Sequence, residues 1–244
     1  MSNNSRRAFL TAAVAIPTTA AVVGLTGGTA HAAYSWSRTL KEGLRGADVT
    51  QLQIRVAGYP GYAAVLATDG VFGAKTKAAV KRFQAAYGLT QDGVAGTNTY
   101  KKIYSLQSSD NTPIHFKYSE LNKCNSTWGG GKVAASTAKS NALRLMWKLE
   151  ALRHALGDKP ITISSGFRSV SCNNRVGGSS TSRHLYGDAA DLTGVHSFCT
   201  MAKRARYHGF RNILGPGFPN HNDHVHLASG GSTWSASKCG INGR

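Results

Sequence analysis

Residues 182–191 read Ser-Arg-His-Leu-Tyr-Gly-Asp-Ala-Ala-Asp, and residues 221–226 read His-Asn-Asp-His-Val-His. Both stretches are rich in imidazole and carboxylate groups, which together with thiolates are the usual protein ligands of zinc. A catalytic zinc site commonly uses three such ligands and leaves a fourth position for water. Water bound in this way loses a proton near neutral pH and becomes a nucleophile for hydrolysis. The two stretches therefore predict the metal site of a zinc hydrolase.

The first stretch predicts a bend that brings two candidate ligands together. Gly187 permits a turn after His184, and the apolar residues on either side of Asp191 predict a short strand. His184 and Asp191 are then expected to meet across the bend. This spacing differs from the His-Glu-x-x-His zinc motif, whose two histidines share one face of a helix.

The second stretch predicts a strand that carries histidines on one face. Alternate side chains of a strand point the same way, so His224 and His226 are expected to share a face. One of them can bind zinc while the other lies beside it in the cleft. His221 is expected to approach from the preceding turn.

The sequence around these motifs predicts an α+β domain over residues 113–244, with a short antiparallel sheet. Residues 137–156 carry an apolar stripe at helical spacing and end before Gly157, a typical helix stop. Residues 161–164 alternate as a half-buried strand and lead into Ser-Gly-Phe-Arg at 165–168. The remaining expected elements are a helix at 198–207 and short strands at 189–193 and 224–228.

Residues 38–106 contain an internal repeat. Residues 69–76 read Asp-Gly-Val-Phe-Gly-Ala-Lys-Thr, and residues 92–99 read Asp-Gly-Val-Ala-Gly-Thr-Asn-Thr. Each copy predicts an Asp-Gly turn followed by the start of a helix. Apolar residues at helical spacing before, between and after the copies predict a small three-helix module. The polar segment 107–112 ends at Pro113 and is expected to be the linker to the second domain.

The first 32 residues have the composition of a removable leader. Arg6 and Arg7 precede an uncharged apolar run from Ala8 to about Leu25, and Ala-His-Ala follows at 30–32. This order is typical of a signal peptide, and the paired arginines indicate the twin-arginine type. A membrane anchor is the alternative, but the run is short of the ~20 strongly apolar residues that a span needs. We expect export, cleavage after Ala32 and no membrane anchor in the mature chain.

The chain is strongly basic. Its net charge of +18 at pH 7 falls to +16 when the two arginines of the leader are removed. A surplus of this size favours polyanionic surroundings. Nucleic acid is not the expected partner, because the sequence has no basic helix, aromatic-interleaved basic sheet or zinc-finger spacing. A cell wall that bears carboxylates and phosphates is the better candidate, and a basic surface that serves solubility alone is the alternative.

The cysteines predict disulfides. Four of them, all after residue 120, stand in the expected mature chain, at Cys124, Cys172, Cys199 and Cys239. An even number in an exported protein favours two disulfides over free thiols. The sequence has no Cys-x-x-Cys pair, which argues against cysteine-bound zinc. Spacing alone leaves all three pairings open.

Residues 33–106 resemble the small peptidoglycan-binding domain of secreted bacterial wall hydrolases. The resemblance is carried by Gln51-Leu52-Gln53, Asp69-Gly70-x-Phe72-Gly73, Thr76, Ala79-Val80, Phe83-Gln84, Gly88-Leu89 and Asp92-Gly93-x-x-Gly96. It implies that the three-helix module binds the cell wall. A helical spacer without a ligand of its own is the alternative.

Residues 113–244 resemble the zinc D-alanyl-D-alanine peptidases of bacterial cell walls, and most closely their secreted actinomycete carboxypeptidases. The resemblance is carried by Ser182-x-His184-x-x-Gly187-x-Ala189-x-Asp191 and the downstream Asp-His-x-His. It implies one zinc ion per chain, with His184, Asp191 and His226 as ligands. It also implies that Arg168 faces the substrate carboxylate or developing negative charge, which a guanidinium group suits.

The same resemblance suggests roles for further residues of the cleft. It places the general base three residues before the last ligand, at Asp223, and His224 and His221 are the competing candidates. We expect Asp223 to act as the base, with His224 assisting at the oxyanion or the leaving group. Ser182 and Tyr186 are expected to line the substrate cleft or to hold its loop.

These implications converge on a secreted, monomeric carboxypeptidase that removes terminal D-alanine from peptidoglycan stem peptides. The same metal site serves D,D-endopeptidases and L-alanyl-D-glutamate endopeptidases, so these activities are alternatives. A non-catalytic wall-binding protein is a third alternative, which the intact ligand set disfavours. A serine hydrolase is disfavoured because the sequence has neither a Gly-x-Ser-x-Gly nor a Ser-x-x-Lys motif. The resemblance also favours the disulfides Cys124–Cys172 and Cys199–Cys239.

Overall fold

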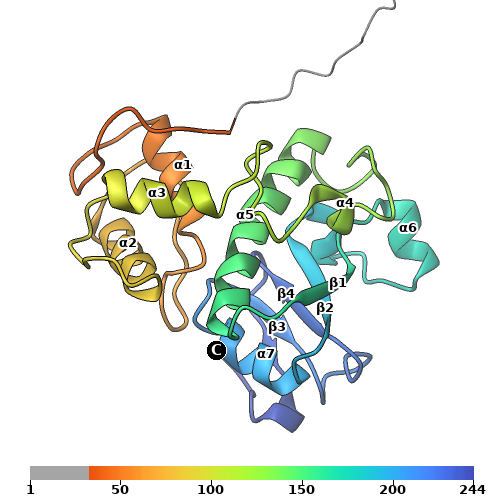
Figure 1. The fold of residues 1–244 in the computed structure, drawn as a ribbon. Coiled ribbons are helices and arrows are strands. Elements are labelled where there is room, and N and C mark those ends of the chain that lie inside the picture. The colour runs from red at the N-terminus through yellow and green to blue at the C-terminus, as the bar shows by residue number, and fades with distance from the viewer. Residues whose placement is uncertain (1–32) are drawn as a thin grey trace, which may run out of the picture. The chain divides into compact units, whose positions relative to one another are not determined.

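The computed structural model describes residues 33–244, so the predicted leader lies outside the described residues. Within that range no helix is both long enough and apolar enough to cross a membrane. The described chain confirms the α+β expectation (Figure 1). Its helices are α1 (Ala47–Arg55), α2 (Ala74–Ala86), α3 (Thr97–Ser105), α4 (Tyr118–Leu121), α5 (Ala135–Ala155), α6 (Val170–Arg175) and α7 (Phe198–Ala205). Its strands are β1 (Ile161–Ser165), β2 (Ala189–Gly194), β3 (Asn212–Leu214), β4 (Val225–Ala228) and β5 (Trp234–Ser235).

The internal repeat folds into two copies of one hydrogen-bonded turn. In the first copy the buried Gln53 amide donates to the Oδ1 atom of Asp69 at 2.9 Å and accepts from the backbone N–H of Gly70 at 2.9 Å. In the second copy Gln84 makes the same two bonds, to Asp92 at 2.8 Å and from Gly93 at 2.9 Å. Each glutamine therefore fixes the turn that precedes the next helix, α2 or α3.

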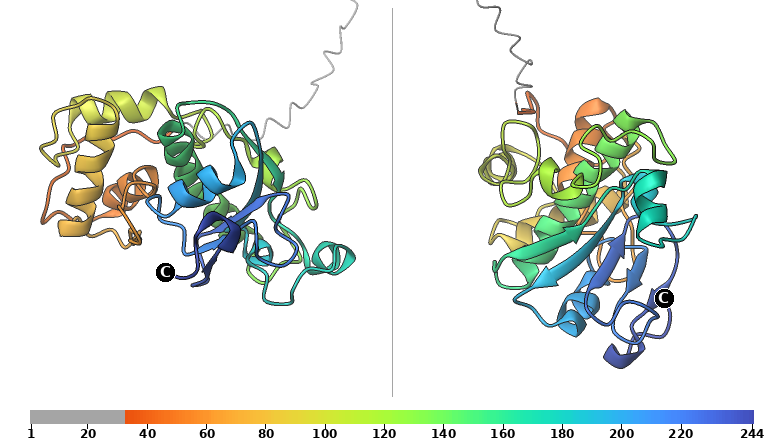
Figure 2. Two further views of the ribbon diagram at one scale, coloured as in Figure 1. Left: turned by 90° about the horizontal axis from the view of Figure 1, so that it is seen from below. Right: turned by 90° about the vertical axis from the view of Figure 1, so that its right-hand side faces the viewer.

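The core of the three-helix module includes side chains from α5. Trp147 and Ala151 of this helix are buried among the apolar side chains of α1, α2 and α3. The indole N–H of Trp147 donates to the carbonyl of Asn111 at 3.0 Å. The segment expected to be a linker is thereby tied to a helix of the second domain. Figures 1 and 2 show α5 between the module and the sheet.

The strands form one sheet in the order β1-β2-β4-β3-β5. All neighbouring pairs are antiparallel except β3 and β5, which are parallel. The predicted antiparallel sheet is therefore present, with one parallel pair at its edge. In the β2–β4 pair, Asp191 lies opposite His226, and Leu192 lies opposite Val225.

The two faces of the sheet have different environments. Side chains of a strand alternate between faces, and Leu192 and Val225 are buried in a core with α5 and α7. Asp191 and His226 alternate with these residues and so lie on the opposite face. Helices α5 and α7 thus cover one face, and the polar residues predicted to bind metal lie on the other.

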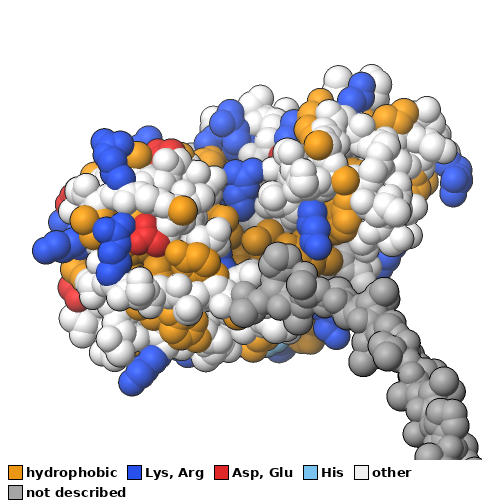
Figure 3. Space-filling view, turned by 90° about the horizontal axis from the view of Figure 1, so that it is seen from above, with side chains coloured by type: hydrophobic (Ala, Val, Ile, Leu, Met, Phe, Trp, Pro, Cys, Tyr) orange, Lys and Arg blue, Asp and Glu red, His pale blue; other side chains and the backbone are white. Residues whose placement is uncertain are grey.

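Both expected disulfides are formed, Cys124–Cys172 and Cys199–Cys239, with Cα atoms 6.3 and 5.0 Å apart. The first ties the segment after α4 to α6, and the second ties α7 to the C-terminal segment. The basic composition is visible on the surface, because Lys and Arg side chains outnumber the acidic ones on the face in Figure 3.

Candidate metal centre

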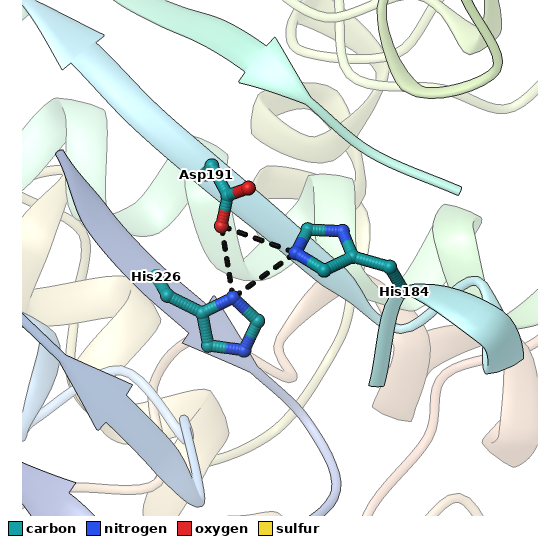
Figure 4. A group of neighbouring side chains, drawn as sticks. All are labelled: His184, Asp191 and His226. Carbon is teal, nitrogen blue, oxygen red and sulfur yellow. Dashed lines mark hydrogen bonds and ion pairs between the residues drawn. The ribbon is translucent and has the colours of Figure 1, made fainter. Parts of the chain in front are cut away.

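Three donor atoms meet on the polar face of the sheet. The Nε2 atom of His184 lies 3.1 Å from the Oδ1 atom of Asp191 and 3.1 Å from the Nδ1 atom of His226. That Nδ1 atom lies 2.9 Å from the same Asp191 oxygen. The three side chains point toward one another (Figure 4), and all three are buried. The structure therefore brings together the three residues that the sequence resemblance names as zinc ligands.

Strand register and one turn account for this convergence. Asp191 and His226 are direct partners in the β2–β4 ladder. His184 lies in a 3-10 turn, Arg183–Tyr186, that runs directly into β2. Gly187 ends this turn with a φ of 72°, a left-handed conformation that glycine adopts without steric cost. A Cβ at this position would lie 2.5 Å from the carbonyl oxygen of Ala138 in α5, so no larger residue fits.

A backbone contact fixes the orientation of the His184 ring. The Nδ1 atom of His184 lies 2.6 Å from the carbonyl oxygen of Gly166. A carbonyl can only accept, so Nδ1 carries the hydrogen and Nε2 presents its lone pair to the other two donors. Histidine ligands of metals typically donate their second ring N–H in this way. Only glycine fits at position 166, because a Cβ there would overlap the backbone of Leu121.

The donor set fits zinc. Two imidazole nitrogens and one carboxylate oxygen form a typical catalytic set of three protein ligands. Ligands 2.0–2.2 Å from a tetrahedral zinc stand ~3.4 Å apart, so the triangle needs to open by only a few tenths of an ångström. Burial lowers the pKa of His226 to about 4. The ring is therefore neutral at pH 7 and able to donate its lone pair.

Asp191 is held by a second set of contacts. Its Oδ2 atom accepts from Nη2 of Arg168 at 2.8 Å, while Oδ1 faces the two histidines. Nη2 and Nε of Arg168 also donate to Ser165 Oγ, at 2.7 and 3.0 Å. Burial by itself raises the pKa of Asp191, but the field and hydrogen bonds of His184 and His226 lower it well below the usual range. The carboxylate is thus ionised and aimed at the centre.

A cleft with a volume of about 660 Å³ opens over these three residues. One side is formed by the loop after α6 and the other by the segment 218–221. Asn173, which is buried, braces the first side by donating to the carbonyls of Gly178 and Ser179 at 2.9 and 3.0 Å. The donors therefore lie at the floor of a cleft whose volume is in the range of small-ligand sites.

The histidines expected near the metal also line this cleft. The Nε2 atom of His224 lies 3.8 Å from Oδ1 of Asp191, and its Nδ1 atom lies 2.8 Å from Oδ1 of Asp223. The Asp223 side chain is 87% exposed and is not among the residues that line the cleft. The hydrogen bond from His224 lowers the pKa of Asp223. The candidate base predicted first thus reaches the cleft only through the imidazole beside it.

His221 takes the position expected from the preceding turn. Its Nδ1 atom lies 2.6 Å from the carbonyl oxygen of Pro219, so Nδ1 carries the hydrogen. Its ring centroid lies 4.7 Å from that of His224. Burial lowers the pKa of His221, which favours its neutral form. His221 thus lines the cleft beside His224.

The two expected substrate residues differ in their positions. Ser182 lines the cleft, as expected, but Tyr186 does not. The ring of Tyr186 instead lies under the guanidinium of Arg183, 4.1 Å from its carbon, and Arg183 is paired with the buried Asp188. Arg183 lines the cleft and was missed by the sequence reasoning, although it directly precedes a ligand. Asn212 and Phe218 also line the cleft, and no sequence pattern indicated either.

Comparisons with known proteins agree with this geometry. A family model described as peptidase M15 matches residues 114–228, and one described as a putative peptidoglycan binding domain matches residues 45–103. The zinc D-Ala-D-Ala carboxypeptidase of Streptomyces albus G is 61% identical over 231 residues, which are 94% of this chain and 91% of that protein.

Two further relatives match over a smaller part of the chain. A probable N-acetylmuramoyl-L-alanine amidase of Bacillus licheniformis is 45% identical over 67 residues, which are 26% of this chain and 19% of that protein. The N-acetylmuramoyl-L-alanine amidase CwlM of Mycobacterium tuberculosis is 36% identical over 80 residues, which are 32% of this chain and 19% of that protein.

Proposed function

The chain belongs to the peptidase M15 family, and on this premise we propose that it is a zinc D-alanyl-D-alanine carboxypeptidase. The enzyme removes the terminal D-alanine of peptidoglycan stem peptides, and its module of residues 33–106 binds the wall. The observation that carries the proposal is the buried triangle of His184, Asp191 and His226 at the floor of the cleft. The similarity to the zinc D-Ala-D-Ala carboxypeptidase of Streptomyces albus G, 61% identical along nearly the whole chain, supports the proposal.

His184, Asp191 and His226 would hold the zinc ion. When bound, zinc polarises the scissile carbonyl and lowers the pKa of water to about 7. The protein contributes a fixed and largely dry set of donors: one ring is held by the Gly166 carbonyl, and the carboxylate is held by Arg168. These contacts keep the lone pairs of His184 and Asp191 directed at one point before any substrate arrives.

Arg168 has two tasks. Its Nη2 group is engaged by Asp191 and Ser165, and its Nε group by Ser165. Among the described residues Nη1 has no hydrogen-bond partner, and Arg168 lines the cleft. Nη1 is therefore free to donate to the substrate carboxylate or to the oxyanion that develops during hydrolysis.

His224 transfers the proton. Its Nε2 atom faces the metal centre, while Asp223 holds its Nδ1 atom at 2.8 Å. A carboxylate on Nδ1 keeps the hydrogen there and leaves Nε2 as the base. Asp223, which the sequence resemblance ranked first, then acts through the ring rather than on the water. The neutral His221, whose Nε2 atom carries a lone pair, completes the wall and is the second candidate for the base.

The enzyme works at the cell wall after export. Its membership in a family of wall peptidases and its peptidoglycan-binding domain support this location. Residues 1–32 serve as a twin-arginine leader, and the mature chain acts as a monomer. Western blotting of the culture medium and of the wall fraction tests the export step, because retention of an uncleaved chain in cells would contradict it.

The first experiment measures release of D-alanine from a blocked L-Lys-D-Ala-D-Ala tripeptide by the purified mature chain. We expect release that a chelator abolishes and added zinc restores. His115→Ala is the matched control for replacing a histidine of the metal centre, such as His226→Ala. His115 is paired with Glu150 away from the cleft, so this control should leave the rate unchanged. Release that persists without metal would refute the zinc mechanism.

The same preparation separates the rival activities. Cross-linked peptidoglycan fragments are incubated with the enzyme, and the products are identified by mass spectrometry. Cleavage of cross-links without release from the tripeptide would assign an endopeptidase. Wall binding with neither reaction, in a zinc-loaded protein, would assign a binding protein without activity.

A further inference from the structure

A second cavity system lies apart from the metal cleft. Two cavities, with volumes of about 670 and 500 Å³, share the lining residues Ala155, Arg204 and Tyr207. The first lies between the C-terminal ends of α2 and α5 and the segment 58–62, and the second extends along α7. We call the two together the α7 groove. Within the described chain, no residue lines both this groove and the metal cleft.

Cations without acidic partners line the α7 groove. They are Arg82, Lys203, Arg204 and Arg206, and in the described part of the chain none has a carboxylate oxygen within 4.0 Å. The nearby Asp158 follows the lining residue Gly157, but Arg153 and His154 already engage its carboxylate, at 2.9 and 3.0 Å. The groove therefore presents several positive charges that the protein itself does not neutralise.

Two exposed tyrosines lie among these cations. Tyr62 is 55% exposed and Tyr207 is 44% exposed, and their ring centroids are 5.1 Å apart. The guanidinium carbon of Arg206 lies 5.6 Å from the centroid of the Tyr62 ring. Aromatic rings that remain in water beside cations offer an apolar face and a polar edge at once. Such a surface suits a polymeric ligand in which C–H faces alternate with negatively charged groups.

We propose that the α7 groove binds a phosphodiester-linked sugar or polyol chain, the repeating unit of an anionic wall polymer. Guanidinium groups match phosphate oxygens with two parallel hydrogen bonds, and the tyrosine rings pack on the carbon faces between phosphates. The cations are spread over both cavities, from Arg82 to Lys203, which fits repeated charges along a chain better than one isolated anion. The site holds the enzyme on the wall independently of the metal cleft.

The test uses a soluble glycerol phosphate oligomer and the mature chain, with binding measured by calorimetry. We expect binding that weakens as the salt concentration rises, because exposed charges are screened. The double variant Arg204→Ala/Arg206→Ala should bind at least ~10-fold more weakly, since it removes two charge-assisted contacts. The matched control Lys75→Ala/Lys101→Ala removes two exposed cations elsewhere and should bind as the parent does.

A second pair of variants tests the aromatic face. Tyr207→Ala should weaken binding, whereas Tyr207→Phe, which keeps the ring, should restore it. Because none of these residues lines the metal cleft, every variant should release D-alanine from the soluble tripeptide at the parent rate. A parent-like rate also shows that the variant is folded.

Three outcomes would overturn the assignment. Equal affinity of the Arg204→Ala/Arg206→Ala variant and the control would mean that the groove is not the site. Tighter binding of a single-stranded DNA oligomer of equal charge would show a nucleic-acid surface instead. The third outcome comes from sedimentation with cell walls from which acid has removed the phosphodiester polymers. Weaker binding of Arg204→Ala/Arg206→Ala than of the parent to these stripped walls would assign the groove to peptidoglycan, which the module of residues 33–106 alone does not explain.

Discussion

Trp147 is the residue that most directly joins the two predicted domains, and its replacement tests whether they fold as one unit. The side chain projects from α5, is 1% exposed, and lies in the core of the three-helix module. Its N–H group donates to the Asn111 carbonyl at 3.0 Å. Trp147→Ala removes both the packing and the hydrogen bond while leaving the metal face of the sheet untouched.

The expected cost follows from these contacts. Truncation of a buried Trp to Ala costs about 3–5 kcal/mol, and loss of a partner for a part-buried carbonyl adds about 1 kcal/mol. The free energy of unfolding should therefore fall by about 4–6 kcal/mol. For a chain of this size each kcal/mol lowers Tm by about 2–4 °C, so a decrease of at least about 8 °C is expected.

Differential scanning calorimetry of the mature chain measures the effect. The parent should unfold in one transition, and in the variant the module should melt ahead of the peptidase domain. Val195→Ala is the control, because Val195 is 71% exposed and its truncation should cost less than about 0.5 kcal/mol. A single transition with a loss below about 1 kcal/mol in Trp147→Ala would refute the shared-core argument.

Three further predictions concern the site and its supporting helix. His226→Ala should abolish zinc binding and D-alanine release together, measured by metal analysis and the tripeptide assay; activity in a metal-free variant would contradict the ligand assignment. His224→Gln should keep zinc but lower kcat by ~10²–10⁴-fold, as for a general base, whereas Asp223→Asn should cost only ~10-fold; the reverse order would return the base to Asp223. Burial lowers the pKa of Lys148 to about 7, so between pH 7 and the ordinary lysine pKa the unfolded chain binds one more proton than the folded chain. Over that window the free energy of unfolding should rise with pH relative to Lys148→Met in denaturant titrations, and parallel curves would show that Lys148 is not the cause.

Long periodic segments and short motifs were predictable from the sequence. The apolar stripe predicted a helix at 137–156, and α5 spans Ala135–Ala155. The turn expected at Gly187 is present with a positive φ, and it places His184 beside Asp191. In each case the deciding information is local, because helix periodicity and a glycine turn depend on neighbours in the chain.

Features that depend on distant partners were not predictable. Strands β3 and β5 have three and two residues, too few to show an alternating pattern, and they exist because neighbouring strands offer hydrogen bonds. Segment 107–112 has the polar composition of a linker, yet the Asn111 side chain accepts from Arg55 at 2.7 Å and Thr112 is buried. The structure of this segment depends on contacts with residues distant in the sequence, which its composition does not predict.

The candidate site shows the same division. The resemblance named the three donors, but the direct hydrogen bond from Arg168 to Asp191 joins residues 23 positions apart. Ser165, the last residue of β1, accepts from the same guanidinium. The pairing of Arg183 with Asp188 and its packing on the Tyr186 ring were likewise not predictable from the motif. The spacing of a motif predicts the candidate ligands, whereas the residues that orient these ligands become known only from the folded structure.

Gly166 and Gly187 set a boundary on how this enzyme can be redesigned. A Cβ at Gly166 would overlap the backbone of Leu121, and a Cβ at Gly187 would overlap that of Ala138. Both positions lie beside the candidate ligand His184. No rotamer change relieves such a contact. In a saturation library screened for new peptide specificity, both codons should return glycine alone, while those for Ser182 and Asn212 in the cleft wall should diversify. New peptide specificity is therefore expected from substitutions in the cleft wall, while the two glycines beside the metal centre stay unchanged.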